Sequence, residues 1–290
     1  MWSTMLLTSI RHKRSPAVLV LLLLFGITAC ATIEKGPLTD PQGWIIHREF
    51  LSHTKDSKKK VELFWTKPTG DGPYAAVLFI HGHQEQIRDG GESYVKSGLL
   101  GRLASHGYVA AVISQPGYGN SSGPPDYCGP FTQEAVLVAA NFLRKQAFIK
   151  GDKLALFGYS RGAIVASMVA TQDQRLGAVV LGAGVYDFFK WYPTPLPGID
   201  NLIRTEAGTS AEAFKARSSI YHVEKIKAPV LLLHGARDER VPLQQAEAFA
   251  EKLKANGVVF KIKIFPNARH SIPIDELLRE IYPFLEEFLH

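Results

Sequence analysis

The sequence predicts an α/β fold whose sheet is mostly parallel and carries helices on both faces. Short, almost entirely apolar segments recur along the 290 residues, and strands buried on both faces of a parallel sheet have this composition. Segments with helical periodicity lie between them, and this alternation is typical of α/β folds. The sequence shows no internal repeat and no second apolar core, so we expect one large domain at 44–290.

About eight segments are expected to form the sheet, with helices between them. The strands are expected at 45–51, 61–65, 75–80, 109–113, 154–157, 178–181, 230–233 and 258–265. The helices are expected at 92–106, 132–145, 163–169, 242–255 and 274–289, where apolar residues recur with helical spacing. The charged run 54–60 predicts a solvated hairpin turn between the first two strands. Residues 184–222 predict a small, cap-like insertion after the sixth strand.

The stretch 157–162, Phe-Gly-Tyr-Ser-Arg-Gly, follows one expected strand and precedes a helix. A G-x-S-x-G pattern in this context indicates a nucleophile elbow, a sharp turn that lifts the serine hydroxyl above the sheet edge. Gly158 and Gly162 lack a β-carbon, so the strand and the helix can approach closely there. Ser160 would then stand at a helix N-terminus, which favours developing negative charge. The alternative for the motif alone is a glycine-rich turn with a capping serine.

Two further polar side chains follow expected strands. Asp238 lies just past 230–233, and His270 lies just past 258–265. The order Ser160, Asp238, His270 is the chain order of α/β-hydrolases. In such a set His270 removes the serine proton and Asp238 orients the imidazole. The alternatives are a helix-capping role for Asp238 and a surface position for His270, and the adjacent Glu239 is a second candidate for the acid.

Three pieces of the sequence resemble the α/β-hydrolase fold over residues 44–290. They are Gly-Tyr-Ser-Arg-Gly at 158–162, His-Gly-Ala-Arg-Asp-Glu-Arg-Val-Pro at 234–242 and Ala-Arg-His-Ser at 268–271. They are most similar to the catalytic domains of prolyl oligopeptidase-like and dienelactone hydrolase-like enzymes. The resemblance implies an oxyanion hole formed by the backbone N–H groups of His83 and Arg161. An oxyanion hole stabilises the tetrahedral intermediate of acyl transfer.

The sequence departs from the pattern of true prolyl oligopeptidases in one respect, which concerns their β-propeller. Residues 31–44 alone separate Cys30 from the first expected strand, so we expect no propeller in this sequence. Because the propeller filters substrates in those enzymes, a free-standing esterase or amidase fits better. We therefore expect a serine hydrolase that cleaves an ester or amide bond through an acyl-enzyme. The alternatives are a small peptidase of the prolyl oligopeptidase-like type and a non-catalytic binding lipoprotein of the cell envelope.

Metal and cofactor sites are not expected. His81 and His83 have H-x-H spacing, but Gln84, Glu85 and Gln86 follow without another histidine, so the rest of a metal signature is missing. His81 is instead expected to order the oxyanion loop. The glycine-rich loop 116–123 resembles a structural turn of this fold and has no P-loop lysine.

The aromatic residues of the insertion and Cys128 are the remaining candidates for a functional role. The insertion is rich in aromatic residues: Tyr186, Phe188, Phe189, Trp191 and Tyr192. These rings either line a substrate pocket or pack the insertion onto the domain. Cys128 lies in a loop with no base-bearing motif around it, so we expect a passive small residue.

The N-terminus predicts a secretory signal peptide at 1–29. Arg11, Lys13 and Arg14 precede an apolar core at 17–29, and the core ends in Ile-Thr-Ala-Cys. This ending resembles the bacterial lipobox, which implies cleavage before Cys30 and lipid attachment to its sulfur. Residues 30–43 are expected to be a tether, and the protein is expected to be anchored in the outer membrane, facing the periplasm. The alternatives are an ordinary signal peptide and an uncleaved anchor.

Net charge argues against a nucleic-acid binder. The formal charge is +6, and the signal segment supplies three basic residues and no acid, which leaves +3 for the rest. We therefore expect a small ester or amide substrate and the membrane as partners.

Overall fold

The computed structural model describes residues 37–290. The expected signal peptide, Cys30 and the first part of the tether lie outside the described residues. The strands are β1 (His47–His53), β2 (Asp56–Thr66), β3 (Tyr74–Ile80), β4 (Val109–Ile113), β5 (Ile149–Tyr159), β6 (Ala178–Gly182), β7 (Val230–Gly235) and β8 (Phe260–Phe265). The helices outside the insertion at 184–222 are α1 (Glu92–Lys96), α2 (Leu99–Ser105), α3 (Pro130–Arg144), α4 (Arg161–Ala170), α8 (Gln244–Ala255) and α9 (Ile274–Leu289).

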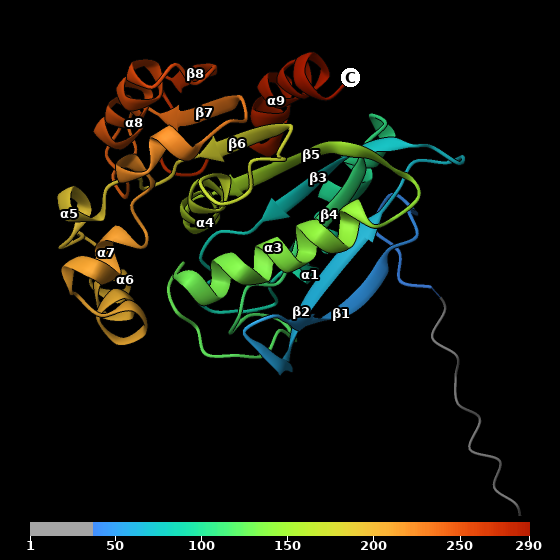
Figure 1. The fold of residues 1–290 in the computed structure, drawn as a ribbon, viewed down its shortest axis with the longest axis horizontal. Coiled ribbons are helices and arrows are strands. Elements are labelled where there is room, and N and C mark those ends of the chain that lie inside the picture. The colour runs from blue at the N-terminus through green and yellow to red at the C-terminus, as the bar shows by residue number, and fades with distance from the viewer. Residues whose placement is uncertain (1–36) are drawn as a thin grey trace, which may run out of the picture. The chain divides into compact units, whose positions relative to one another are not determined.

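All eight strands form one sheet, in the order β1-β2-β4-β3-β5-β6-β7-β8. The pairs β1–β2 and β2–β4 are antiparallel, and the other five pairs are parallel. The sheet is continuous across Figure 1, with α3 and α4 in front of it. The predicted fold class is therefore confirmed.

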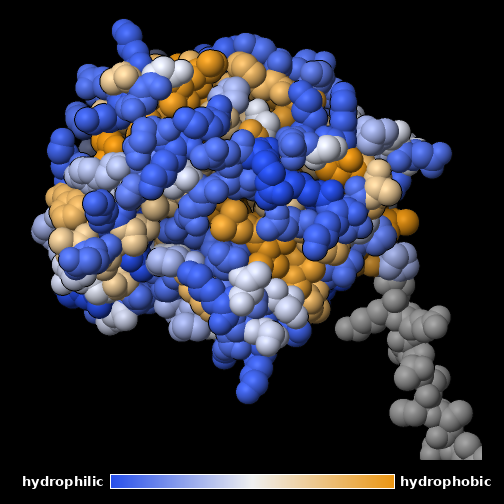
Figure 2. All heavy atoms as spheres, in the orientation of Figure 1, coloured by the Kyte–Doolittle hydropathy of each residue, from blue (hydrophilic) through white to orange (hydrophobic). Residues whose placement is uncertain are grey.

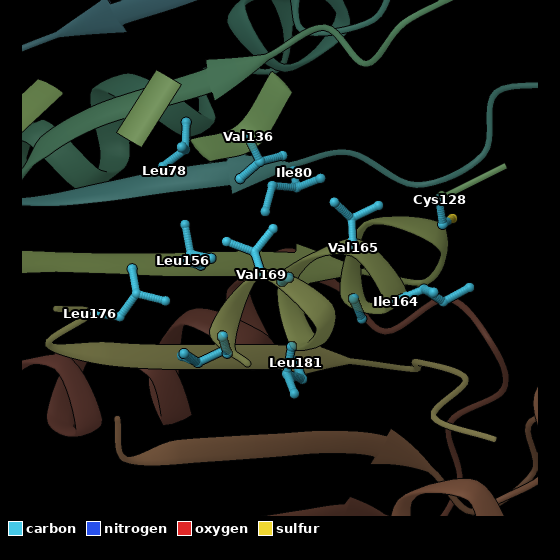
Figure 3. Close-up of a cluster of buried hydrophobic side chains, with 14 of the residues drawn as sticks. Leu78, Ile80, Cys128, Val136, Leu156, Ile164, Val165, Val169, Leu176 and Leu181 are labelled. Carbon is cyan, nitrogen blue, oxygen red and sulfur yellow. The ribbon is translucent and has the colours of Figure 1, made fainter. Parts of the chain in front are cut away.

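Each face of the sheet has its own apolar core. Alternate side chains of β3 divide between the two: Leu78 and Ile80 join the core under α3, α4 and α8, whereas Val77 and Phe79 join the core under α1, α2 and α9. Figure 3 shows part of the first core, where side chains of β3, β5, β6 and α4 meet. Because both faces of the central strands are covered, their sequences are apolar without alternation.

Two of the differences from the predicted boundaries have a clear structural cause. The helix expected at 92–106 is two helices, because Gly98 has φ +74° and cannot continue the first one. The run 54–60 is not a long turn, since β2 begins at Asp56 and its lysines extend the strand that pairs with β1. Charged residues on a solvated strand lack the apolar alternation that marks a strand in sequence.

Residues 37–43, which we expected to belong to the tether, pack on the domain instead. Thr39 forms a β-bridge with Ile45, and the buried Asp40 accepts hydrogen bonds from the backbone N–H groups of Gln42 and Trp44. This turn lies against Gly101 of α2, where an added β-carbon would overlap Asp40 and Gln42. Local hydrogen bonds together with the contact with α2 fix this segment, although its own sequence is polar and rich in turn residues.

The predicted insertion follows β6. Its helical segments are α5 (Phe188–Trp191), α6 (Pro197–Leu202), the π-helix η1 (Ile203–Ala207), α7 (Ala211–Lys215) and the 3₁₀ turns η2 (Ser219–Tyr221) and η3 (Val223–Lys225). In Figure 1 the segments α5, α6 and α7 lie together beside the carboxyl end of β6. The aromatic residues of the insertion divide between roles: Phe188 and Tyr186 are buried in the core, whereas Phe189 is exposed.

The surface carries both hydrophilic and apolar residues. On the face shown in Figure 2, hydrophilic side chains predominate and apolar residues form smaller groups between them. Among residues 37–290, no helix has the length and apolar character needed to cross a bilayer.

We predict that Gly162→Ala destabilises the fold. The added β-carbon would overlap the backbone carbonyl of Ile80, so β3 and α4 would have to separate. Overpacking of this kind costs about 1–3 kcal/mol. The measurement is the free energy of unfolding in urea. The matched control is Gly198→Ala, because a β-carbon there meets nothing within 4 Å. Equal stability of the two variants would contradict the prediction.

Candidate active site

The predicted site residues meet at the carboxyl edge of the sheet. His81 and His83 follow β3, Ser160 follows β5, Asp238 follows β7 and His270 follows β8. Because these four strands are parallel, their carboxyl ends lie on the same edge. The fold therefore brings together residues that are up to 189 positions apart, from His81 to His270.

Ser160 stands on a strained turn between β5 and α4. Its φ and ψ are +53° and −119°, which is an unusual conformation for a residue with a side chain. Its N–H donates to Gly182 O at 2.7 Å, which fixes the turn to the neighbouring strand. A β-carbon at Gly158 would overlap Gly162 O, so the glycines allow the close contact that the turn requires.

A continuous hydrogen-bonded chain links the serine to the acid. Ser160 Oγ lies 2.8 Å from His270 Nε2, and His270 Nδ1 lies 2.8 Å from Asp238 Oδ2. Asp238 is buried, and its Oδ1 accepts from the backbone N–H groups of Arg240 and Val241, each at 2.9 Å. An ionised carboxylate only accepts, so Nδ1 carries the imidazole proton and Nε2 is free to accept from Ser160. The other candidate acid, Glu239, is exposed and lies beside Arg269.

The surroundings keep Asp238 ionised. Burial by itself raises the pKa of this carboxyl, but the hydrogen bonds from His270, Val241 N–H and Arg240 N–H outweigh burial and hold the pKa below its usual value. Asp238 therefore supplies a fixed negative charge next to the imidazole. The same contacts explain why sequence alone left a helix-capping role open, because Asp238 also binds the backbone that leads into the next helix.

Two residues that the sequence analysis did not single out support the triad geometry. The Tyr159 hydroxyl donates to His270 O at 2.7 Å and accepts from Ile272 N–H at 3.0 Å, so it fixes the loop that carries the histidine. His234 is buried beside Asp238 and donates from Nε2 to Val241 O at 2.9 Å. Burial lowers the pKa of His234, which favours its neutral form. The position of Tyr159, just before the nucleophile, is the one sequence signal for its role.

The loop that is expected to supply one oxyanion donor is held by His81. This side chain is fully buried, its Nδ1 donates to Gly82 O at 2.8 Å, and its Nε2 accepts from Gln115 N–H at 3.1 Å. Gly82 O and His83 N–H belong to one peptide plane and point in opposite directions. By holding the carbonyl, His81 therefore directs the His83 N–H away from itself. Burial lowers the pKa of His81 to about 4, so the ring stays neutral.

Neither of the two expected oxyanion donors has an acceptor in the part of the chain that the structure describes. Among residues 37–290, the N–H groups of His83 and Arg161 donate to no other group. Arg161 is the first residue of α4, where a backbone N–H has no partner inside the helix. Gly82 lies close to the nucleophile turn, since a β-carbon there would stand 3.3 Å from Tyr159 O.

The histidine pair is engaged in hydrogen bonds rather than arranged for a metal. Both ring nitrogens of His81 have partners in the protein, and His83 Nδ1 lies 3.0 Å from the Tyr118 hydroxyl. Within the described part of the chain, no group of three or more histidine, cysteine or acidic side chains is arranged to hold a metal ion.

The Arg161 side chain reaches the insertion, which the sequence did not indicate. The guanidinium is buried between the rings of Tyr118 and Tyr127, 5.2 and 4.6 Å from their centroids, and Nη2 donates to Glu206 Oε2 at 3.4 Å. Its Nε and Nη1 have no acceptor among the described residues. Cys128 is buried next to it, where its Sγ donates to Arg161 O and burial raises the pKa of the thiol to about 12. Cys128 is thus a packed residue.

Two cavities adjoin Ser160. The smaller, of about 40 Å³, lies toward α4 and the insertion, and Trp191, Leu196 and Ile199 form part of its wall. The larger, of about 390 Å³, lies toward α1, α2 and α9. The sequence left open whether the aromatic rings of the insertion line a pocket or pack against the domain. Trp191 lines a cavity, while most of the other rings pack in the core.

We predict that Asp238→Asn weakens the dependence of stability on acid pH. A carboxyl whose pKa is lowered by folding contributes stability above its unfolded pKa of about 4, and this contribution is lost as pH falls through the lower folded value. The asparagine variant lacks this pH-dependent contribution and loses charge-assisted hydrogen bonds. Its free energy of unfolding at pH 7 should therefore be lower by about 1–3 kcal/mol. Urea unfolding between pH 3 and 7 should show this gap shrinking toward pH 3. A constant gap would contradict the prediction.

The chain matches two protein-family models. The model of the prolyl oligopeptidase family matches residues 128–290, and the model of the X-Pro dipeptidyl-peptidase (S15) family matches residues 42–200. Each match covers more than half of the 290 residues.

Individual proteins are also similar to this chain. The chain is 28% identical over 199 residues to the uncharacterized peptidase YtmA of Bacillus subtilis, covering 67% of this chain and 75% of that protein. It is 24% identical over 263 residues to acylamino-acid-releasing enzyme 2 of Oryza sativa, covering 84% of this chain but 32% of the rice enzyme. The structure of Pyrococcus horikoshii acylaminoacyl peptidase superposes with a TM-score of 0.69 at 20% identity, covering 85% of this chain and 42% of that one. This chain therefore belongs to the prolyl oligopeptidase family of serine peptidases, with the α/β-hydrolase fold.

Proposed function

We propose that this protein is a serine peptidase that cleaves amide bonds in short or acylated peptides through a covalent acyl-enzyme. The observation that carries the proposal is the unbroken hydrogen-bonded chain from Ser160 through His270 to Asp238. Family membership and relatives named as acylamino-acid-releasing enzymes and dipeptidyl-peptidase favour the peptidase, which was our alternative, over the esterase. A serine hydrolase of this kind can also cleave esters, since ester alcohols leave more easily than amines.

The chemistry follows from the positions of the three side chains. Ser160 Oγ attacks the substrate carbonyl carbon while His270 Nε2 takes its proton. The resulting imidazolium lies against the Asp238 carboxylate, whose charge stabilises it. His270 then gives the proton to the departing amine, and the acyl group remains on Ser160 until water, activated by the same imidazole, removes it.

The oxyanion of each tetrahedral intermediate requires donors, and we assign this role to the N–H groups of His83 and Arg161. Both lack partners within the described chain, and both lie in the turns that flank Ser160. A single donor of this kind contributes about 3 kcal/mol to transition-state stabilisation. The small cavity beside Arg161 would hold the acyl side of the substrate, so we expect small acyl groups to be preferred.

We predict that Ser160→Ala abolishes both labelling by a fluorophosphonate probe and turnover of a peptidyl and ester substrate panel, with kcat falling by about 10⁶-fold. The loss follows because the alcohol that forms the covalent bond is gone. Ser57→Ala, at an exposed position on β2, is the matched control and should label normally. Absence of labelling in the folded wild-type protein would instead support a non-catalytic binding protein.

We also propose that the protein is a lipoprotein of the bacterial envelope, anchored through Cys30 in the outer membrane and facing the periplasm. Support comes from the basic segment, the apolar core and the Ile-Thr-Ala-Cys ending of residues 1–30. Several acyl chains on one cysteine would anchor the protein stably.

We predict that Cys30→Ser abolishes incorporation of radioactive palmitate in a Gram-negative host and releases the protein from the membrane fraction. The sulfur that would carry the diacylglyceryl group is then missing. Cys128→Ser is the matched control, since Cys128 is the second of the two cysteines and is buried in the fold. Palmitate labelling of the Cys30→Ser protein would refute lipidation at this site.

A further inference from the structure

The larger cavity beside Ser160 has a predominantly apolar wall. Its volume is about 390 Å³, which is within the range of small-molecule pockets. Its wall combines aromatic rings of β3, β5 and α1 with aliphatic residues of α2, α9 and the loop before α9: Phe79, Tyr94, Leu99, Phe157, Tyr159, Ile272, Ile274 and Leu277. These rings are held by one another, with Phe79 4.8 Å from Phe157 and 4.5 Å from Tyr94 between centroids.

The break between α1 and α2 helps to form this space. Gly98, in its left-handed conformation, ends the first helix and turns the chain, so that Ser97 and Leu99 both reach the cavity wall. Ser97 is exposed, which places it at the rim, whereas Leu99 is buried. The large cavity is therefore open to solvent beside Ser97 and apolar beside Leu99.

The charges around the cavity disfavour a cationic occupant. The charged side chains of its wall other than the histidines are Arg102 and Arg240, and no aspartate or glutamate of residues 37–290 lines it. Arg102 is paired with Asp275 outside the wall. An aromatic wall can bind an ammonium group through cation–π contacts, but here the charged side chains of the wall itself are positive. A neutral apolar group is the occupant that this wall favours.

The position of the cavity relative to His270 decides which part of a substrate enters it. The leaving group must depart beside His270 Nε2, which gives it a proton. The residues that follow His270 in sequence include Ser271, Ile272 and Ile274. These three line the large cavity and no part of the small one. The small cavity is instead lined by Arg161 and Ile164 of α4, on the side of the second oxyanion donor, and by the insertion.

We propose that the large cavity is the leaving-group subsite and that it selects substrates with a bulky, neutral, apolar leaving group. The inference rests on the proposed acyl-transfer function. In that step the bond from Ser160 Oγ to the acyl carbon forms, and the bond from this carbon to the leaving nitrogen or oxygen breaks. The leaving group carries away the proton that His270 took from Ser160, and no other reactant is required.

The test is a series of N-acetylalanine esters that share one acyl group and differ in the alcohol: methanol, butanol, hexanol, 3,3-dimethylbutanol and choline. Because every ester gives the same acyl-enzyme, differences in kcat/KM report the acylation step alone. Burial of each additional methylene should raise kcat/KM up to about fourfold, so hexyl should exceed butyl by on the order of tenfold. The 3,3-dimethylbutyl ester should exceed the choline ester, which has the same shape and a positive charge.

The variant Ser97→Trp tests whether the large cavity itself is the origin of the preference. A tryptophan at the rim would occupy the mouth of the cavity, and the backbone of Ser97 (φ −78°, ψ −10°) accepts any side chain. The ratio of hexyl to methyl kcat/KM should fall to about the ratio of uncatalysed reactivities. The matched control is Ser57→Trp on exposed β2, which should keep the wild-type ratio.

Three results would overturn the inference, and they are distinguishable. Fluorophosphonate labelling of Ser160 with kcat/KM that does not change across the alcohols would refute the subsite and leave the proposed function standing. In a second series of methyl esters that differ in acyl length, a preference for longer acyl groups that Ser97→Trp removes would place the acyl group in this cavity instead. Absence of both labelling and turnover would refute the proposed function, and the subsite with it.

Discussion

The close approach of three backbone segments around Ser160 is the constraint on which the site depends. Strand β3, the nucleophile turn and helix α4 touch at Gly158, Gly162 and Gly82, where β-carbons would overlap or crowd the neighbouring backbone. This contact forces the strained conformation of Ser160 and places the first amide of α4 beside it. Both the nucleophile and one expected oxyanion donor are therefore products of packing rather than of side-chain contacts.

Buried hydrogen bonds then fix the parts that backbone packing does not. His81 holds the peptide between Gly82 and His83, and Tyr159 holds the loop of His270 at two backbone positions. Each of these groups is buried or half-buried, so an unmade hydrogen bond would be costly and alternative loop conformations are disfavoured. The site is thus organised before a substrate arrives, which is the condition for electrostatic stabilisation of a transition state.

The sequence anticipated the elements whose signals are local. Apolar segments such as 75–80 and 178–181 marked the buried strands, because strands covered on both faces need no polar positions. It missed the break at Gly98 and the packing of residues 37–43. The break follows from the left-handed conformation of Gly98, whereas the turn at Asp40 is held against Gly101 of α2, a partner distant in sequence.

By itself the sequence determined the fold class, the nucleophile turn and the order of Ser160, Asp238 and His270, because each lies in a local pattern directly after a strand. The tertiary structure alone decided that the Arg161 side chain reaches Glu206, that Asp238 rather than Glu239 faces the histidine, and that two unequal cavities flank the serine. These features depend on side-chain directions and on the space left between elements that are far apart in the chain, and a linear pattern carries neither.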